Sequence, residues 1–168
     1  FMFVGLDGVL SGWNGAAGNF AIRVTHNAGS VYTGMAIATN GGSSYIYASD
    51  FRNRKIDVWN QSFSAVNMSF TDPGLPDGYA PFNVQAIDNK LYVMYAKVGT
   101  NGRDENGPGD GYVSVFNADG SFVNRFISRG QLDAPWGVAK APANFWGEGS
   151  DNPENVILVG NFGDGRIN

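Results

Sequence analysis

The sequence predicts an all-β protein, a segment of a β-propeller, from three observations: many turn-forming residues, few helix-forming residues and a recurring β-rich unit. Glycine contributes 24 of the 168 residues, about twice its usual share of ~7%. Asp outnumbers Glu by twelve to three. Gly and Asp favour tight turns, whereas Glu favours helices. This composition excludes a helical bundle, a coiled coil and a collagen-like fibre.

The repeating unit has a short apolar strand, a polar loop, a second strand, a Gly/Asp/Asn turn, and a third strand that ends on an aromatic residue. In successive copies these aromatic residues are Trp13, Trp59 and Phe116. Trp59 lies 46 residues after Trp13, and Phe116 lies 57 residues after Trp59. The excess in the second interval sits in one polar insertion, residues 97–111. A period in the forties with three or four strands per unit is typical of a propeller blade.

The repeat divides the chain into a partial blade (1–33), two blades (34–80 and 81–134) and a second partial blade (135–168). Each blade is expected to be a four-stranded antiparallel sheet. Because one such sheet cannot cover both of its faces, blades must pack on one another. Trp13, Trp59 and Phe116 are therefore expected between blades rather than in a sugar-stacking site. Both chain ends look like the inside of a longer polypeptide, and the whole protein is expected to have six blades.

Charge and composition narrow the function classes. The net charge is −4, and a surface without clustered Lys and Arg argues against nucleic acid as a partner. The absence of cysteine excludes disulfides and thiolate sites. No stretch approaches the ~18 apolar residues of a transmembrane segment. The single histidine, His26, is expected to be a surface or turn residue.

Carboxylates between the second and third strands are the first candidate site. Asp7, Asp50 and Asp164 each lie in such a turn beside Gly or Asn. An Asp at this place commonly tightens its own turn. The alternative is a ring of carboxylates at one mouth of the propeller that holds Ca²⁺ together with Asn and backbone oxygens. The candidate binding residues there are Asp50, Arg52, Arg54, Asn161 and Asp164.

The insertion at 97–111 is the second candidate site. Asp104, Glu105, Asn106 and Asp110 are closely spaced oxygen ligands with glycines around them, which suggests Ca²⁺. The order of an EF-hand loop is absent. The alternative is a solvated, flexible loop. A second insertion covers residues 144–155.

Several longer motifs carry a resemblance to a known family. They are residues 8–14, 47–52, 70–76, 80–85, 134–139, 141–145 and 160–168. The repeat resembles the NHL-type β-propeller. It is most similar to an uncharacterised bacterial family of secreted propeller-like proteins, some of which carry a PEP-CTERM sorting tail. The resemblance implies a propeller fold, a polypeptide about twice this length, and export to the cell surface or medium.

These observations favour a non-enzymatic binding or scaffold module that presents its loops to a protein or a glycan. One alternative is a metal-assisted hydrolase, similar to propeller lactonases, with its reacting group near the axis. Another is a structural subunit that self-associates through open blade edges and so closes rings or fibres.

Overall fold

The computed structural model describes residues 1–142, 145 and 156–168. The second insertion, except for Phe145, lies outside the described residues. In the described part, strands form four antiparallel sheets, and the only helix is a single 3-10 turn, η1 (Gly15–Ala17). The predicted all-β class is confirmed.

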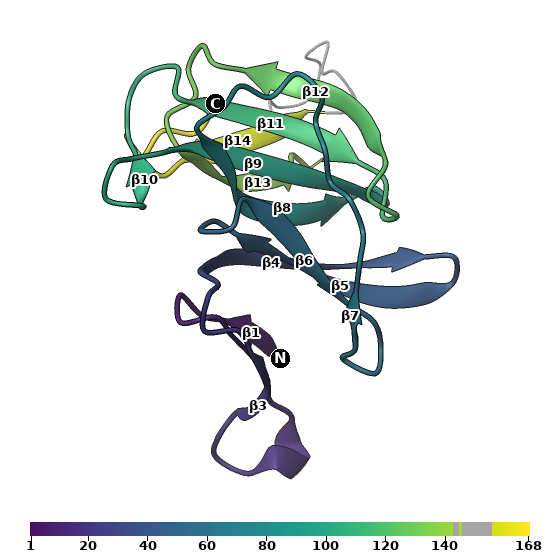
Figure 1. The fold of residues 1–168 in the computed structure, drawn as a ribbon. Helices are drawn as coiled ribbons and strands as arrows, with labels where there is room; N and C mark the ends of the chain where they lie inside the picture. The colour runs from purple at the N-terminus through teal and green to yellow at the C-terminus, as the bar shows by residue number, and fades with distance from the viewer. Residues whose placement is uncertain (143–144, 146–155) are drawn as a thin grey trace.

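The four sheets follow one another along the chain; in Figure 1 the first sheet lies at the bottom, the second above it, and the third and fourth overlap at the top. The first sheet contains β1 (Met2–Val4), β2 (Val9–Gly12) and β3 (Ile22–His26). The second contains β4 (Tyr32–Asn40), β5 (Ser43–Asp50), β6 (Lys55–Trp59) and β7 (Ala65–Val66). The third contains β8 (Tyr79–Ile87), β9 (Lys90–Val98), β10 (Asp104–Glu105), β11 (Gly111–Phe116) and β12 (Phe122–Ser128). The fourth contains β13 (Pro135–Lys140) and β14 (Ile157–Asn161).

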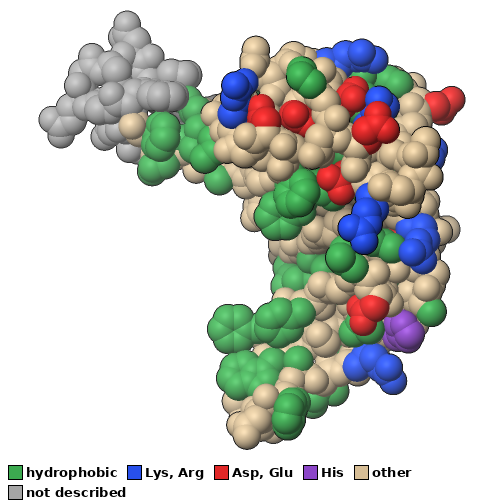
Figure 2. All heavy atoms as spheres, turned by 90° about the vertical axis from the view of Figure 1, so that its left-hand side faces the viewer, with side chains coloured by type: hydrophobic (Ala, Val, Ile, Leu, Met, Phe, Trp, Pro, Cys, Tyr) green, Lys and Arg blue, Asp and Glu red, His purple; other side chains and the backbone are tan. Residues whose placement is uncertain are grey.

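The sheets pack side by side as blades do. Strand β8 contacts both β4 and β13, so the first strands of three successive sheets are neighbours. The outline of the molecule is a crescent with hydrophobic side chains along its hollowed side, as Figure 2 shows. The lone His26 is exposed on the outer strand β3.

The space between sheets is filled by the apolar faces of alternating strands. Trp59 is 6% exposed and packs with Leu10 and Tyr32 between the first and second sheets. Phe116 is fully buried and packs with Tyr47 between the second and third sheets. The expectation that these two aromatic side chains fill inter-blade space is confirmed. The same expectation is wrong for Trp13. This residue is only half-buried and lies outside the apolar cluster between the first and second sheets, and its indole nitrogen donates to the Gly18 carbonyl at 2.8 Å.

The first strands enter their sheets with the same irregularity. The register shifts between Tyr32 and Gly34 in β4, between Pro81 and Asn83 in β8, and between Pro135 and Gly137 in β13. The residues at these β-bulges are Thr33, Phe82 and Trp136. A bulge re-aims one side chain and increases the local twist. The recurrence at one position shows that the second, third and fourth sheets are copies of one unit.

The link between the second and third sheets is held by a buried carboxylate. The side chain of Asp72 is 1% exposed, and its Oδ2 accepts hydrogen bonds from Arg125 Nε and Ser114 Oγ, both at 2.6 Å. Its Oδ1 accepts from the Gly74 amide at 2.9 Å. Burial opposes ionisation, but these hydrogen bonds outweigh it and hold the pKa of Asp72 below its ordinary value. The carboxylate therefore ties the link to β11 and β12.

Replacing the inter-sheet indole should destabilise the fold. Trp59→Ala removes a buried ring and leaves a cavity, so its free energy of unfolding should fall by roughly 3–5 kcal/mol. Phe20→Ala is the matched control, because Phe20 is 82% exposed; its effect should stay within about 0.5 kcal/mol. Urea denaturation followed by circular dichroism measures both. A loss below about 1 kcal/mol in Trp59→Ala would contradict inter-sheet burial.

Asp72 should make the protein sensitive to acid. The pKa of Asp72 is lower in the folded than in the unfolded chain. Its contribution to the free energy of unfolding is therefore fully present above the pKa of an unfolded Asp, which is near 4. It is lost as pH falls through the folded value. Stability measured from pH 7 to pH 2 should therefore fall more steeply below about pH 4 in the parent protein than in Asp72→Asn. Equal slopes would show that the ion pair does not stabilise the fold.

Candidate functional site

One end of the sheets collects most of the sequence-predicted site residues. Two kinds of loop lie at this end: the turn that joins the second and third strands of a sheet, and the segment that leads from one sheet into the first strand of the next. Main-chain hydrogen bonds join the two kinds of loop: the Phe51 amide donates to Val31 O at 2.9 Å, and the Phe162 amide donates to Ala134 O at 3.0 Å. We call this end the loop face; it comprises residues 5–9, 27–31, 50–55, 98–111, 129–134 and 161–166.

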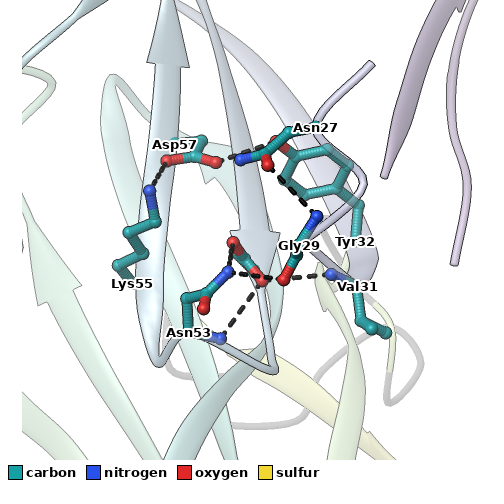
Figure 3. A network of polar contacts seen from close by, with 8 residues as sticks. Asn27, Gly29, Val31, Tyr32, Asn53, Lys55 and Asp57 are labelled. Atoms are coloured by element: carbon teal, nitrogen blue, oxygen red, sulfur yellow. Dashed lines mark hydrogen bonds and ion pairs between the residues drawn. The ribbon is translucent and has the colours of Figure 1, made fainter. Parts of the chain in front are cut away.

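Asp50 is the centre of its own turn, and two of its hydrogen-bond partners, Val31 and Asn53, are labelled in Figure 3. The residue is fully buried, and its Oδ1 accepts hydrogen bonds from the Val31 amide at 3.1 Å and the Asn53 amide at 3.2 Å. Its Oδ2 accepts from Asn53 Nδ2 at 2.7 Å. Arg52 and Arg54 are exposed. The structure therefore separates this predicted set: the carboxylate fastens the turn, and the two arginines remain available on the surface.

Asn161 and Asp164 form the same turn with the amide and the carboxylate exchanged. Asn161 Nδ2 donates to Asp164 Oδ1 at 3.0 Å and to the Gln131 carbonyl at 2.8 Å. Asp164 Oδ1 also accepts from the Arg166 amide at 3.0 Å, and this bond holds the pKa of Asp164 below its ordinary value. The signal was readable in the sequence, because Asp-Phe-x-Asn at 50–53 matches Asn-Phe-x-Asp at 161–164.

The insertion after β9 is attached to the loop face by main-chain bonds. The Gly109 amide donates to Leu132 O at 2.8 Å, and the Ala134 amide donates to Asp110 O at 3.2 Å. The Gly107 amide donates to Asp133 Oδ1 at 2.8 Å. Two of its residues form β10, which pairs with the end of β9. The insertion is thus attached to the loop face through Gly107, Gly109 and Asp110 and to β9 through β10.

The four residues proposed as calcium ligands do not converge on one point. Asp104 and Glu105 are neighbours in β10, so their side chains leave opposite faces of the strand. Glu105 and Asp110 instead share the ammonium of Lys97, at 2.7 and 3.2 Å, and these contacts raise the pKa of Lys97. In the described part of the chain no three or more His, Asp or Glu side chains are grouped to hold a metal ion. The calcium site, with Asn106 as its fourth ligand, stays a prediction without support from this geometry.

A cluster of Tyr79, Tyr112 and Arg129 packs against the insertion through Asp110. The rings of Tyr79 and Tyr112 meet edge to face, with centroids 4.7 Å apart. Tyr79 donates to Asp110 Oδ1 at 3.1 Å, and Arg129 Nε donates to the Tyr112 hydroxyl at 2.7 Å. Burial raises the pKa of Tyr79 to about 12, so it stays a hydrogen-bond donor at neutral pH. Tyr79 lies in β8, Tyr112 in β11, and Arg129 directly after β12, so the sequence pattern alone does not group these residues.

The fold and this site together define the class: the chain is part of a β-propeller. Its structure is similar over 99% of its length to a chain in the crystal structure of a nidogen/laminin complex, with a TM-score of 0.58 and 13% sequence identity, and it covers 59% of that chain. At this identity the likeness shows the fold alone.

Curated relatives come from Acanthamoeba polyphaga mimivirus. The uncharacterized protein L690 is 45% identical over 83% of this chain, R648 is 38% identical over 82%, and R640 is 32% identical over 97%. The chain spans 37%, 34% and 31% of these proteins, about a third of their length. No family model matches the sequence. The NHL and bacterial resemblance, and the total of six blades, stay predictions.

Removing the Asp133 carboxylate should loosen the insertion without unfolding the sheets. In Asp133→Ala the Gly107 amide loses its acceptor, so amide hydrogen exchange in residues 99–110 should speed up. The core strand β9 should keep its protection. Asp77→Ala, which changes an exposed residue of another loop, should leave exchange at 99–110 unchanged. Unaltered exchange in Asp133→Ala would mean that this contact does not fix the insertion.

Proposed function

We propose that this chain is the binding part of a non-enzymatic propeller protein, and that its loop face docks a protein partner. The observation that carries the proposal is the fixed insertion at 98–111. Binding residues are commonly placed on loops that a rigid scaffold holds in position. A pre-ordered loop also loses less conformational entropy when it binds.

The charges of the loop face favour a protein over a nucleic acid. The loop face carries exposed cations at Arg52, Arg54 and Arg103. It also carries an exposed anion, Glu105, whose side chain is 44% exposed. Mixed charges offer complementary contacts to a protein surface, whereas a phosphate backbone selects a continuous basic patch. The structural neighbour comes from a complex of two proteins, which supports the same class of partner.

The alternative functions have less support. No described cluster of carboxylates favours the metal-assisted hydrolase. Self-association through the open blade edges has one observation in its favour: exposed apolar side chains on the first and last sheets, among them Leu6, Phe162 and Ile167. The chain covers about a third of the length of its relatives. Additional blades in a longer protein would cover these same apolar side chains and leave no open edge for a second copy.

Export of the whole protein is also a proposal, and it rests on the resemblance to secreted propellers. In the described residues no helix has the length and apolar character needed to cross a bilayer. Mass spectrometry of the full-length protein recovered from cells and from medium tests export, because an exported chain accumulates outside cells. Retention of all the protein inside cells would contradict it.

Docking at the loop face can be tested by photo-crosslinking of the full-length protein. A photoreactive amino acid at position 103 should capture one discrete protein from an extract of the cells that produce the full-length protein, because this residue is exposed in the insertion. The same probe at position 41, in the β4–β5 turn at the opposite end of the sheets, is the matched control.

Replacing residues 99–110 by a two-residue Asn-Gly turn should abolish capture by a second probe at position 54 and weaken binding of the purified partner at least about tenfold, if the insertion supplies central contacts. Equal capture at positions 103 and 41, or full binding after the replacement, would overturn the proposal.

A further inference from the structure

A cleft lies between the first and second sheets, apart from the insertion. On β6, Lys55, Asp57 and Trp59 share the face that points toward the first sheet, because side chains alternate along a strand. The cleft has a volume of about 260 Å³. Its polar lining comes from Thr25, Asn27, Tyr32, Lys55 and Asp57, and its apolar lining from Val58, Trp59, Ala65 and Val66.

The Asp57 carboxylate is held in a fixed position in this cleft. Its Oδ1 lies 2.6 Å from Lys55 Nζ, and its Oδ2 accepts a 2.8 Å hydrogen bond from the Tyr32 hydroxyl. Burial raises the pKa of Tyr32, and Asp57 adds to this, so the hydroxyl remains a donor. The Tyr32 ring is fixed in turn by an edge-to-face contact with Trp59, at 5.7 Å between centroids.

The cleft keeps unused hydrogen-bonding capacity. The Asp57 side chain is 17% exposed, and each carboxylate oxygen can accept a second hydrogen bond. Lys55 is half exposed and has three donor hydrogens, of which Asp57 uses one. Asn27 and Thr25 add an exposed amide and a partly exposed hydroxyl from the end of β3. Hydrogen-bond acceptors and donors thus lie next to one another, beside the apolar side chains of Ala65 and Trp59.

The ligand that matches this lining is neutral and rich in hydroxyl groups. The ion pair between Lys55 and Asp57 leaves the cleft without net charge. An anionic ligand would be repelled by Asp57, and a cationic ligand would be repelled by Lys55. Hydroxyl groups, which donate and accept, satisfy both. The volume is below the roughly 300–1,000 Å³ of sites for drug-sized ligands, so the ligand unit is small.

We propose that this inter-sheet cleft binds one sugar unit of a neutral saccharide. Asp57 accepts hydrogen bonds from two neighbouring sugar hydroxyls, Lys55 and Asn27 donate to sugar oxygens, and Tyr32 positions the carboxylate. The C–H side of the ring contacts Ala65 and the edge of Trp59, which are paired across β6 and β7 on the same face. The site is separate from the insertion, so it stands whether or not the loop face docks a protein.

Saturation-transfer NMR on the full-length protein tests the cleft with four probes: the methyl glycosides of glucose, galactose, mannose and N-acetylglucosamine. At least one should bind saturably at millimolar concentration. Asp57→Asn keeps the shape of the side chain but loses the charge-assisted bonds, so binding should weaken about tenfold. Asp88→Asn is the matched control, because Asp88 is an exposed partner of a different lysine, Lys140; its binding should equal that of the parent.

A second variant separates loss of binding from loss of fold. Ala65 is exposed at the cleft, so Ala65→Trp should block binding while the thermal unfolding midpoint stays near the parent value. The proposal is overturned if none of the four glycosides binds, or if binding survives in both Asp57→Asn and Ala65→Trp. It is also overturned if inorganic phosphate or Ca²⁺ displaces the bound glycoside, because the cleft would then select an ion.

Discussion

The burial of both faces of each sheet is the constraint on which the rest of the structure depends. The second and third sheets carry buried apolar side chains on both faces, so each is stable only when neighbouring sheets cover it. The second and third sheets show this most fully: Tyr47 and Phe116 are completely buried between them. The Tyr47 hydroxyl reaches the Ala118 carbonyl at 2.7 Å, across 71 residues of sequence. The contact satisfies the one polar atom that burial of this ring would otherwise leave unpaired.

Close contacts between the first strands of neighbouring sheets fix how the sheets pack on one another. A Cβ atom at Gly34 would lie 1.8 Å from Asn83 Oδ1, so a side chain there would force the second and third sheets apart. Asn83 Nδ2 donates to the Trp136 carbonyl at 2.7 Å, and Trp136 Nε1 donates to the Thr33 carbonyl at 2.9 Å. These bonds connect the second, third and fourth sheets. Because they meet at the bulged strand entries, they also set the position of the loop face that begins there.

The loop face and the inter-sheet cleft follow from this packing in different ways. The loop face is made of turns whose carboxylates and amides point inward, as at Asp50, while cations such as Arg54 point outward. The cleft exists because blade packing is complete at Trp59 but incomplete toward Lys55, where polar side chains replace apolar ones. A repeat unit can therefore form a binding site where polar residues replace the apolar residues that pack between sheets, and the fold stays the same.

The sequence by itself determined the all-β class, the repeat and the inter-sheet places of Trp59 and Phe116, because period and hydrophobic pattern are local properties. It also located the Asp50 and Asn161 turns, although it left their role open between fastening and binding. Only the tertiary structure decided that role, since Asp50 is buried against Val31, 19 residues away. It likewise joined Lys97 to Glu105 and Asp110, and Tyr32 to Asp57. Such partnerships depend on strand register and sheet packing, which bring together residues that no short sequence window contains.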